Sequence, residues 1–287
     1  MSIVVTGATG HLGRLAVEAL LDRGVPAHQI IATGRRTEAL ADLARRGVVV
    51  RQADFDDEAS LRKAFIDAER LLLVSGSEIG QRVRQHTNAI EAATAAGVRF
   101  IAYTSIVKAD TSTLLLAEEH RATEQVLARS GVPYALLRNS WYIENYTGQL
   151  PVYLQHGIAG AAGTGGVSAA TRADYAAAAA AVVAGNGHEG AVYELGGAPF
   201  TMAELAEIVS SATGQAVSYT DLPVEQYQAV LVGAGLPEPV AAVFADGDRG
   251  VADGELLVDG NDLEKLIGRA PMSLADAVAS AVAGLRG

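Results

Sequence analysis

The first thirteen residues constrain the fold most, because an apolar run leads directly into three evenly spaced glycines and then into a helical pattern. Ile3–Thr6 has the composition of a buried strand, and apolar residues recur at helical spacing from Leu12 to Leu20. Glycine lacks a Cβ, so the main-chain N–H groups of such a turn can approach a diphosphate at the positive end of a helix. The spacing is G-x-x-G-x-x-G and not the G-x-G-x-x-G of the standard dinucleotide motif, so an ordinary turn is the alternative. The prediction of nucleotide binding therefore depends largely on the strand before the glycines and the helix after them. We expect the diphosphate of a dinucleotide to bind at Gly7, Thr9, Gly10, His11, Leu12 and Gly13.

Strand and helix patterns alternate through the first half of the chain. The predicted strands are Ile3–Thr6, Ile30–Thr33, Val48–Arg51, Leu71–Val74, Phe100–Thr104 and Tyr134–Leu137. The predicted helices between them are Thr37–Arg46, Asp57–Ala68, Gly80–Ala96 and Leu115–Ser130. Such alternation predicts an α/β fold with a Rossmann-type, doubly wound parallel sheet, whose ligand binds over the carboxyl ends of the strands.

The alternation weakens after Arg138, and glycine-rich loops mix with further helical patterns. We therefore divide the chain into a nucleotide-binding domain over residues 1–140 and a smaller α/β substrate region over residues 141–287. Parts of this second region are expected to pack back on the first sheet, with Val192–Leu195 and Val217–Thr220 as strands that return to it or flank it. Thr171 and Asp174 stand in a capping-box arrangement before an alanine run. The helices expected here are Arg172–Ala184, Met202–Thr213, Val224–Ala234 and Ser273–Leu285.

The composition excludes several classes of function. Asp and Glu total 33 against 22 Lys and Arg, and the formal net charge of -11 repels phosphate backbones and anionic lipids, so we expect no nucleic-acid or membrane partner. The absence of cysteine removes thiolate chemistry and cysteine-ligated metals, and the scattered histidines form no H-E-x-x-H motif, so no metal is expected. No apolar run approaches the length of a membrane span and the chain opens without a leader pattern, which predicts a cytoplasmic location.

The end of the second predicted strand indicates which dinucleotide binds. A site for NAD places a carboxylate there for the ribose hydroxyls, whereas this chain has Arg35 and Arg36. A guanidinium presents a fork of donors that suits a phosphate, so we expect Arg35 to contact the 2′-phosphate of NADP(H). The alternative is that both arginines are solvated residues at the start of a helix.

Residues after the next strands are further candidates for the cofactor site. Asp54 is placed to reach the adenine with Phe55 as an apolar neighbour, although a role as a helix N-cap or a loop residue explains Asp54 equally well. The small residues after the fourth and fifth strands leave space for the middle of the cofactor, although serines at strand ends also occur in plain turns. These small residues are Ser75, Gly76, Ser77, Thr104 and Ser105.

With these motifs in view, the chain resembles the NmrA-like, atypical short-chain dehydrogenase family nearly from end to end. Within that family it is most similar to the bacterial NADPH:quinone oxidoreductases of type 2, and triphenylmethane dye reductase is a slightly more distant relative. The resemblance implies a Rossmann core, an NADPH site along the glycine loop, Arg35, Ser75–Ser77 and the segment after Arg138, and a cleft closed by the C-terminal part. The segments that carry the resemblance are Gly7–Gly13, Arg35, the segment from Gly80 through Arg82 to His86, Ala102–Ser105, Ala109–Ser112, Leu137–Tyr142 and Ala170–Tyr175.

Membership of that family does not by itself imply catalysis, because the founding NmrA protein is a nucleotide-sensing regulator that binds a transcription factor. A typical short-chain dehydrogenase has Tyr-x-x-x-Lys, in which the lysine lowers the tyrosine pKa. No tyrosine of this chain has a lysine four positions later, and the corresponding helix has Leu116 and His120 instead. Simple alcohol dehydrogenation is therefore disfavoured.

Quinone reduction is the chemistry that these residues still support. Hydride addition to a quinone gives an aromatic hydroquinone anion, so the protein must mainly orient the two rings, exclude water and place donors at the developing phenolate. Asn139, Tyr142 and His120 are the catalytic candidates, with a solvated helix face as the alternative for His120. Asn139, Trp141, Tyr142 and Asn145 are also expected at the cofactor, and Tyr146 is expected to stack or shape the pocket, unless this cluster is a core element.

We therefore expect an enzyme that transfers hydride directly from NADPH to a quinone or another small aromatic acceptor. A catalytically silent NADP(H) sensor and a reductase of triphenylmethane dyes are the alternatives. The sequence leaves open the physiological electron acceptor, the oligomeric state, any regulatory partner, and whether one side chain donates the proton.

Overall fold

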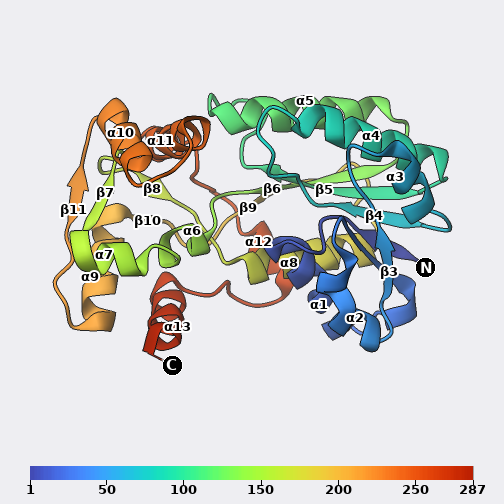
Figure 1. The fold of residues 1–287 in the computed structure, drawn as a ribbon, viewed down its shortest axis with the longest axis horizontal. Coiled ribbons are helices and arrows are strands. Elements are labelled where there is room, and N and C mark those ends of the chain that lie inside the picture. Colours follow the sequence, from blue (N-terminus) through green and yellow to red (C-terminus); the bar gives the residue numbers. More distant parts are fainter. Residues whose placement is uncertain (287) are drawn as a thin grey trace.

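One parallel sheet of seven strands, in the order β3-β2-β1-β4-β5-β6-β9, organises the fold (Figure 1). The computed structural model describes residues 1–286. The winding reverses at β1, which pairs in parallel with β2 on one side and with β4 on the other, so that Val4 lies opposite Ile31 and Leu71. The strands are β1 (Ile3–Val5), β2 (Ile30–Gly34), β3 (Val49–Gln52), β4 (Arg70–Leu73), β5 (Phe100–Ile106), β6 (Tyr134–Asn139) and β9 (Val192–Leu195).

Both faces of this sheet are covered by helices, which explains the continuous apolar runs of its strands. Successive side chains of a strand point to opposite faces, so Ile3 and Val5 pack in one core layer while Val4 packs in the other. The first layer contains α1 (His11–Asp22), α2 (Ala41–Arg45), α8 (Arg172–Ala184) and α12 (Asp262–Ile267). The second contains α3 (Glu58–Ala64), α4 (Arg82–Ala95) and α5 (Leu115–Arg129).

A second lobe with its own apolar core stands beside the carboxyl ends of the strands (Figure 1). Two small sheets belong to it, one pairing β8 with β10 and the other pairing β7 with β11. Its elements are α6 (Ile143–Thr147), α7 (Leu150–His156), β7 (Ile158–Gly160), β8 (Gly166–Val167), β10 (Phe200–Thr201), α9 (Met202–Thr213), β11 (Tyr219–Asp221), α10 (Val224–Gly233), α11 (Glu238–Ala252) and α13 (Leu274–Arg286).

The predicted fold class is confirmed, since all six expected strands form the parallel sheet. Of the two later strands, Val192–Leu195 extends the sheet as β9, whereas the other pairs with β7 in the second lobe as β11. The sequence analysis missed α11, because Gly247 and Gly250 interrupt its helical pattern. The structure shows their purpose: an added Cβ would lie 3.2 Å from the Trp141 ring at Gly247 and 2.5 Å from Leu114 at Gly250. The division at residue 140 stays a prediction.

The predicted capping box before the alanine run of α8 is only half formed. Thr171 Oγ1 accepts a hydrogen bond from Asp174 N at 3.1 Å, as an N-cap should. The carboxylate of Asp174 accepts from the Thr171 hydroxyl and from Met272 N, at 2.8 and 2.9 Å, so it ties the loop before α13 to the start of α8. A complete capping box occurs instead at Thr201 and Glu204, at the start of α9.

Candidate active site

A cavity of about 710 Å³ runs along the carboxyl ends of the sheet strands and under α11; we call it the cleft. This is the position at which a doubly wound sheet binds its ligand. Almost every residue predicted for the site lines it, and the roles assigned to them stay predictions. The predicted residues in its wall are Gly7, Thr9, Gly10, His11, Leu12, Gly13, Arg35, Asp54, Phe55, Ser75, Gly76, Ser77, Ser105, His120, Asn139, Trp141, Tyr142 and Asn145.

The glycine loop has the geometry that a diphosphate requires. Gly7 has a φ of +61°, and its carbonyl oxygen accepts from Gly10 N at 2.9 Å, which closes the turn. Gly13 allows the helix to pack on this turn, because an added Cβ would lie 2.6 Å from the carbonyl carbon of Gly7 and 2.9 Å from Ala8 N. Gly10 caps α1 without a side-chain bond to its first N–H groups. These donors lie at the positive end of the helix and fit an anionic ligand.

The basic end of the cleft lies where β2 ends. The side chain of Arg35 is 66% exposed and forms a 3.0 Å ion pair with Glu78 Oε1, which the sequence analysis did not single out. Exposed ion pairs contribute little free energy, so this contact leaves the guanidinium free to move. Close packing fixes the strand end, since a Cβ on Gly34 would lie 2.6 Å from Thr9 Cγ2. A ligand phosphate at this edge would meet Arg35 and Arg36, both of which line the cleft.

The loop after β4 forms the middle of the cleft wall, and side chains on the buried side of the loop hold its backbone in place. Ser75 N donates to Thr104 Oγ1 at 2.9 Å, and Gly76 N donates to His86 Nε2 at 3.0 Å. Thr104, which was predicted to be a cofactor residue, is buried and is not part of the cleft wall, and its contact with the cofactor stays a prediction. Its hydroxyl is turned toward the backbone of Ser75, so it positions the loop that lines the cleft.

Arg82 is a cleft residue that the sequence analysis missed. Its Nε donates to Gly76 O at 3.0 Å, and its Nη1 lies 2.6 Å from Glu119 Oε2. Glu119 also accepts from Gly80 N at 3.0 Å. Arg82 was part of a segment that carried the family resemblance, but only the fold brings this arginine on α4 to Glu119 on α5.

Asn139 and Tyr142 meet at the opposite end of the cleft. Asn139 Oδ1 is buried and has no hydrogen-bond partner among residues 1–286, so it is an acceptor available to a ligand. Burial raises the pKa of Tyr142, which keeps its phenol neutral. Arg172 was missed, although it stands at the start of a predicted helix: its Cζ lies 4.4 Å from the centre of the Tyr142 ring, and its Nη2 donates to Asn145 Oδ1 at 2.9 Å. The amide oxygen of Asn145 is therefore engaged within the protein.

His120 is buried, so the alternative of a solvated helix face is wrong for it. The residue is only 6% exposed and lines the cleft from α5, one turn after Leu116. Its Nδ1 lies 2.7 Å from Tyr103 Oη. Burial and then the charge of Arg82 lower the pKa of His120 well below its usual value, so the imidazole is neutral at pH 7. Ser105 lies nearby, and its hydroxyl donates to Glu124 Oε1 at 2.6 Å.

Helix α11 closes the cleft with apolar side chains that the sequence analysis did not single out. They are Val240, Val243 and Phe244, and Trp141 packs between this helix and the sheet. Tyr146 was expected to stack or shape the pocket unless it is a core element, and the structure favours the second alternative: it is buried in the second-lobe core and does not line the cleft, with its ring centre 5.7 Å from that of Phe200. The substrate end therefore combines apolar aromatic walls with a few polar groups, as small-molecule sites do.

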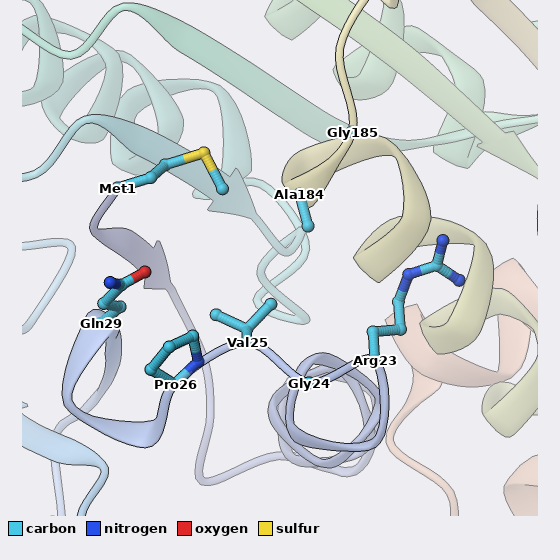
Figure 2. Close-up of a pocket in the computed structure, with 8 residues that line it drawn as sticks. All are labelled: Met1, Arg23, Gly24, Val25, Pro26, Gln29, Ala184 and Gly185. Atoms are coloured by element: carbon cyan, nitrogen blue, oxygen red, sulfur yellow. The ribbon is translucent and has the colours of Figure 1, made fainter.

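A second hollow, of about 290 Å³, lies far from these residues, between the end of α1 and the end of α8 (Figure 2). Its centre is formed by the side chains of Met1, Val25 and Ala184, and the glycines Gly24 and Gly185 lie at its edges. No residue predicted for the site lines it.

Comparison with known proteins agrees with this geometry. The NmrA-like family model matches residues 1–253. The chain belongs to the NmrA-like family. Within the part that the structure describes, no helix of this family member is long and apolar enough to cross a membrane.

Two relatives match this NmrA-like chain along almost its whole length. It is 50% identical to quinone oxidoreductase 2 of Escherichia coli K12 over 278 residues, which are 96% of this chain and 97% of the relative. The crystal structure of the E. coli enzyme with NADPH superposes with a TM-score of 0.94, covering 97% and 99% of the two chains. Triphenylmethane reductase of Citrobacter sp. is 39% identical, with a TM-score of 0.92 and coverage of 99% and 100%.

Proposed function

We propose that this protein is an NADPH-dependent oxidoreductase that reduces quinones by two electrons. The observation that carries the proposal is its 50% identity to E. coli quinone oxidoreductase 2 over nearly the full length of both chains. The cleft supports it, because one end has the glycine loop and two arginines while the other has aromatic and apolar walls. Both ends belong to one continuous space, as hydride transfer between two bound rings requires.

The described residues fit NADPH as the cofactor. The loop of Gly7, Gly10 and Gly13 would hold the diphosphate on main-chain N–H groups, and Arg35 would meet the 2′-phosphate. Asn139 would receive an amide N–H of the nicotinamide, since its buried Oδ1 has no partner among residues 1–286. When bound, NADPH supplies a hydride, and the quinone takes one further proton from solvent to become a hydroquinone.

The substrate end supports this reaction without a strong acid. Reduction of a quinone creates an aromatic product, so the main demands are ring orientation, exclusion of water and donors at the oxygen that gains charge. Trp141 and Phe244 provide flat apolar surfaces, and Tyr142 provides a neutral O–H donor. The cation of Arg172 over the Tyr142 ring holds that ring in place.

Reduction of triphenylmethane dyes is a second candidate function. The 39% identity to Citrobacter triphenylmethane reductase over 99% of this chain favours it. The same cofactor and the same hydride serve both reactions, so the two candidates differ only in how the acceptor fits against the apolar walls that Trp141 and α11 provide. A cytoplasmic location and the lack of nucleic-acid and membrane partners stay predictions from composition.

Turnover with defined acceptors tests the proposal. Purified protein at catalytic concentration is mixed with NADPH and 1,4-benzoquinone, and the loss of nicotinamide absorbance is followed. We expect many turnovers per protein molecule and slower reduction with NADH. Crystal violet in place of the quinone tests the second candidate by loss of its colour. Tight NADPH binding in a calorimeter without turnover of either acceptor would refute both reactions and support a nucleotide sensor.

A further inference from the structure

A tyrosine behind the cleft wall makes a direct contact with His120. Tyr103 lies in the middle of β5 and is completely buried, and its Oη is 2.7 Å from His120 Nδ1. The other ring nitrogen of His120, Nε2, has no hydrogen-bond partner within residues 1–286, and this atom is not fully buried. His120 lines the cleft. The imidazole therefore has one nitrogen on the protein and one available to a ligand.

The neighbouring hydrogen bonds determine which atom donates in the Tyr103–His120 pair. His86 Nε2 accepts from Gly76 N, so His86 Nδ1 carries the proton and donates to Thr123 Oγ1 at 3.1 Å. The Thr123 hydroxyl in turn donates to a backbone carbonyl oxygen of α5 at 2.9 Å. Thr123 also lies beside the Tyr103 phenol, and its hydroxyl has used its one donor and one of its two acceptor positions. An imidazole nitrogen is a more basic acceptor than the position that is left on Thr123, so the O–H of Tyr103 points to His120 Nδ1.

We propose that Tyr103 fixes His120 in the neutral tautomer with its proton on Nε2, so that His120 donates a hydrogen bond to an acceptor oxygen in the cleft. Tyr103 is then a positioning residue, and His120 is the group that touches the substrate. The identity of the acceptor, a quinone, rests on the proposed function. A neutral imidazole holds its N–H proton firmly, so it stabilises the charge that forms on the oxygen without giving up that proton.

The protonation states of both partners agree with this assignment. Burial raises the pKa of the Tyr103 phenol, which therefore stays a donor. The charge of Arg82 acts on both partners, and its guanidinium is engaged with Glu119. Together with burial, this cation lowers the pKa of His120, so the ring has one N–H across the neutral range. That single proton can occupy only one of the two ring nitrogens.

The tautomer can be measured without any turnover. Protein with ¹⁵N-labelled histidine is examined by NMR between pH 5.5 and 8, and the signals of His120 are identified by their loss in His120→Gln. We expect a protonated Nε2 and an unprotonated Nδ1 that accepts a hydrogen bond, with no change over this pH range. In Tyr103→Phe the Nδ1 signal should move toward that of a free acceptor.

Kinetics with 1,4-benzoquinone test the role of the donor. We expect His120→Leu to lower kcat about 100-fold, the cost typical of losing one donor at a developing oxyanion. His120→Gln keeps an N–H donor and should recover part of that loss. Tyr103→Phe should lower kcat roughly fivefold, as expected for one neutral hydrogen bond, with NADPH affinity unchanged.

A matched control exists in the same chain. Tyr193 Oη lies 2.7 Å from His188 Nδ1, a tyrosine–histidine pair of the same length outside the cleft, and Tyr193→Phe should leave kcat unchanged. A wild-type His120 protonated on Nδ1 would overturn the proposal, as would unchanged Nδ1 shifts and kcat in Tyr103→Phe. Failure of the wild type to reduce benzoquinone overturns the quinone assignment instead, and the NMR result separates this outcome from an incorrect tautomer.

Discussion

Substitution of Gly13 by alanine tests whether the close packing of the glycine loop is what allows NADPH to bind. The added Cβ would lie 2.6 Å from the carbonyl carbon of Gly7 and 2.9 Å from Ala8 N, and both of these are backbone atoms that cannot rotate away. Ordinary carbon contacts are roughly 3.5 Å or longer, so α1 and the loop must separate by about 1 Å. The N–H groups at the start of α1 would then no longer converge with the rest of the loop.

The size of the effect follows from that displacement. Overpacking of this kind costs about 1–3 kcal/mol of stability, and a displacement of about 1 Å in a binding site can cost up to about 100-fold in function. We therefore expect Gly13→Ala to lower the Tm by a few degrees and to weaken NADPH binding at least tenfold, as measured by scanning calorimetry and by titration calorimetry.

Gly233→Ala is the matched control, because it lies in α10 with no atom within 4 Å of the added Cβ. Gly233 is the last residue of this helix, so the change to alanine should raise stability by no more than about 0.5 kcal/mol and leave NADPH binding unchanged. If Gly13→Ala bound NADPH as tightly as the wild type, the role assigned to the loop would be wrong.

Three further substitutions address the other parts of the molecule. Arg35→Glu should reduce the preference for NADPH over NADH by at least about tenfold in kcat/KM, since a charge-assisted phosphate contact becomes a repulsion; an unchanged preference would contradict the assignment. Tyr142→Phe should lower kcat for benzoquinone about tenfold with little effect on NADPH affinity, and equal kinetics would limit this residue to packing. Burial raises the pKa of Asp248 to about 6, although its carboxylate accepts from Ala161 N at 2.8 Å. The raised pKa means that the folded state holds the proton more tightly, so stability falls as the pH rises from about 4 to 6. Asp248→Asn should therefore stabilise the protein at pH 7.5 by roughly 2–3 kcal/mol and have little effect at pH 4, and equal Tm changes at both pH values would refute this.

The sheet and the residues that line the glycine-loop end of the cleft could be predicted because their signals are local. Each buried strand is a short apolar run, and a polar or small residue at its end lies at the shared carboxyl edge wherever the strands are parallel. Gly7, Arg35 and Ser75 were found in this way. The same rule does not place Thr104 in the cleft wall, because successive strand residues point to opposite faces and its side chain is buried.

The missed residues depend on contacts between distant segments. Arg82 acts through Glu119 on another helix, and Arg172 lies over a ring that precedes it by thirty positions. Helix α11 was missed because its glycines, which normally disfavour helices, are needed for its approach to Trp141. Such features are set by packing in three dimensions, and one sequence alone carries no pattern for them.

The path of the chain between the two lobes limits how the cleft can open. After β6 the chain enters the second lobe, returns to the sheet for α8 and β9, leaves again, and comes back once more for α12 before it ends in α13. Several separate connections therefore link the lobes, in contrast to the single hinge of many two-domain proteins. Rotation of one lobe away from the other about one of these connections would strain the remaining connections. We therefore expect acceptors to enter the cleft through small sliding movements of α11, and we expect flat molecules to enter more readily than bulky ones.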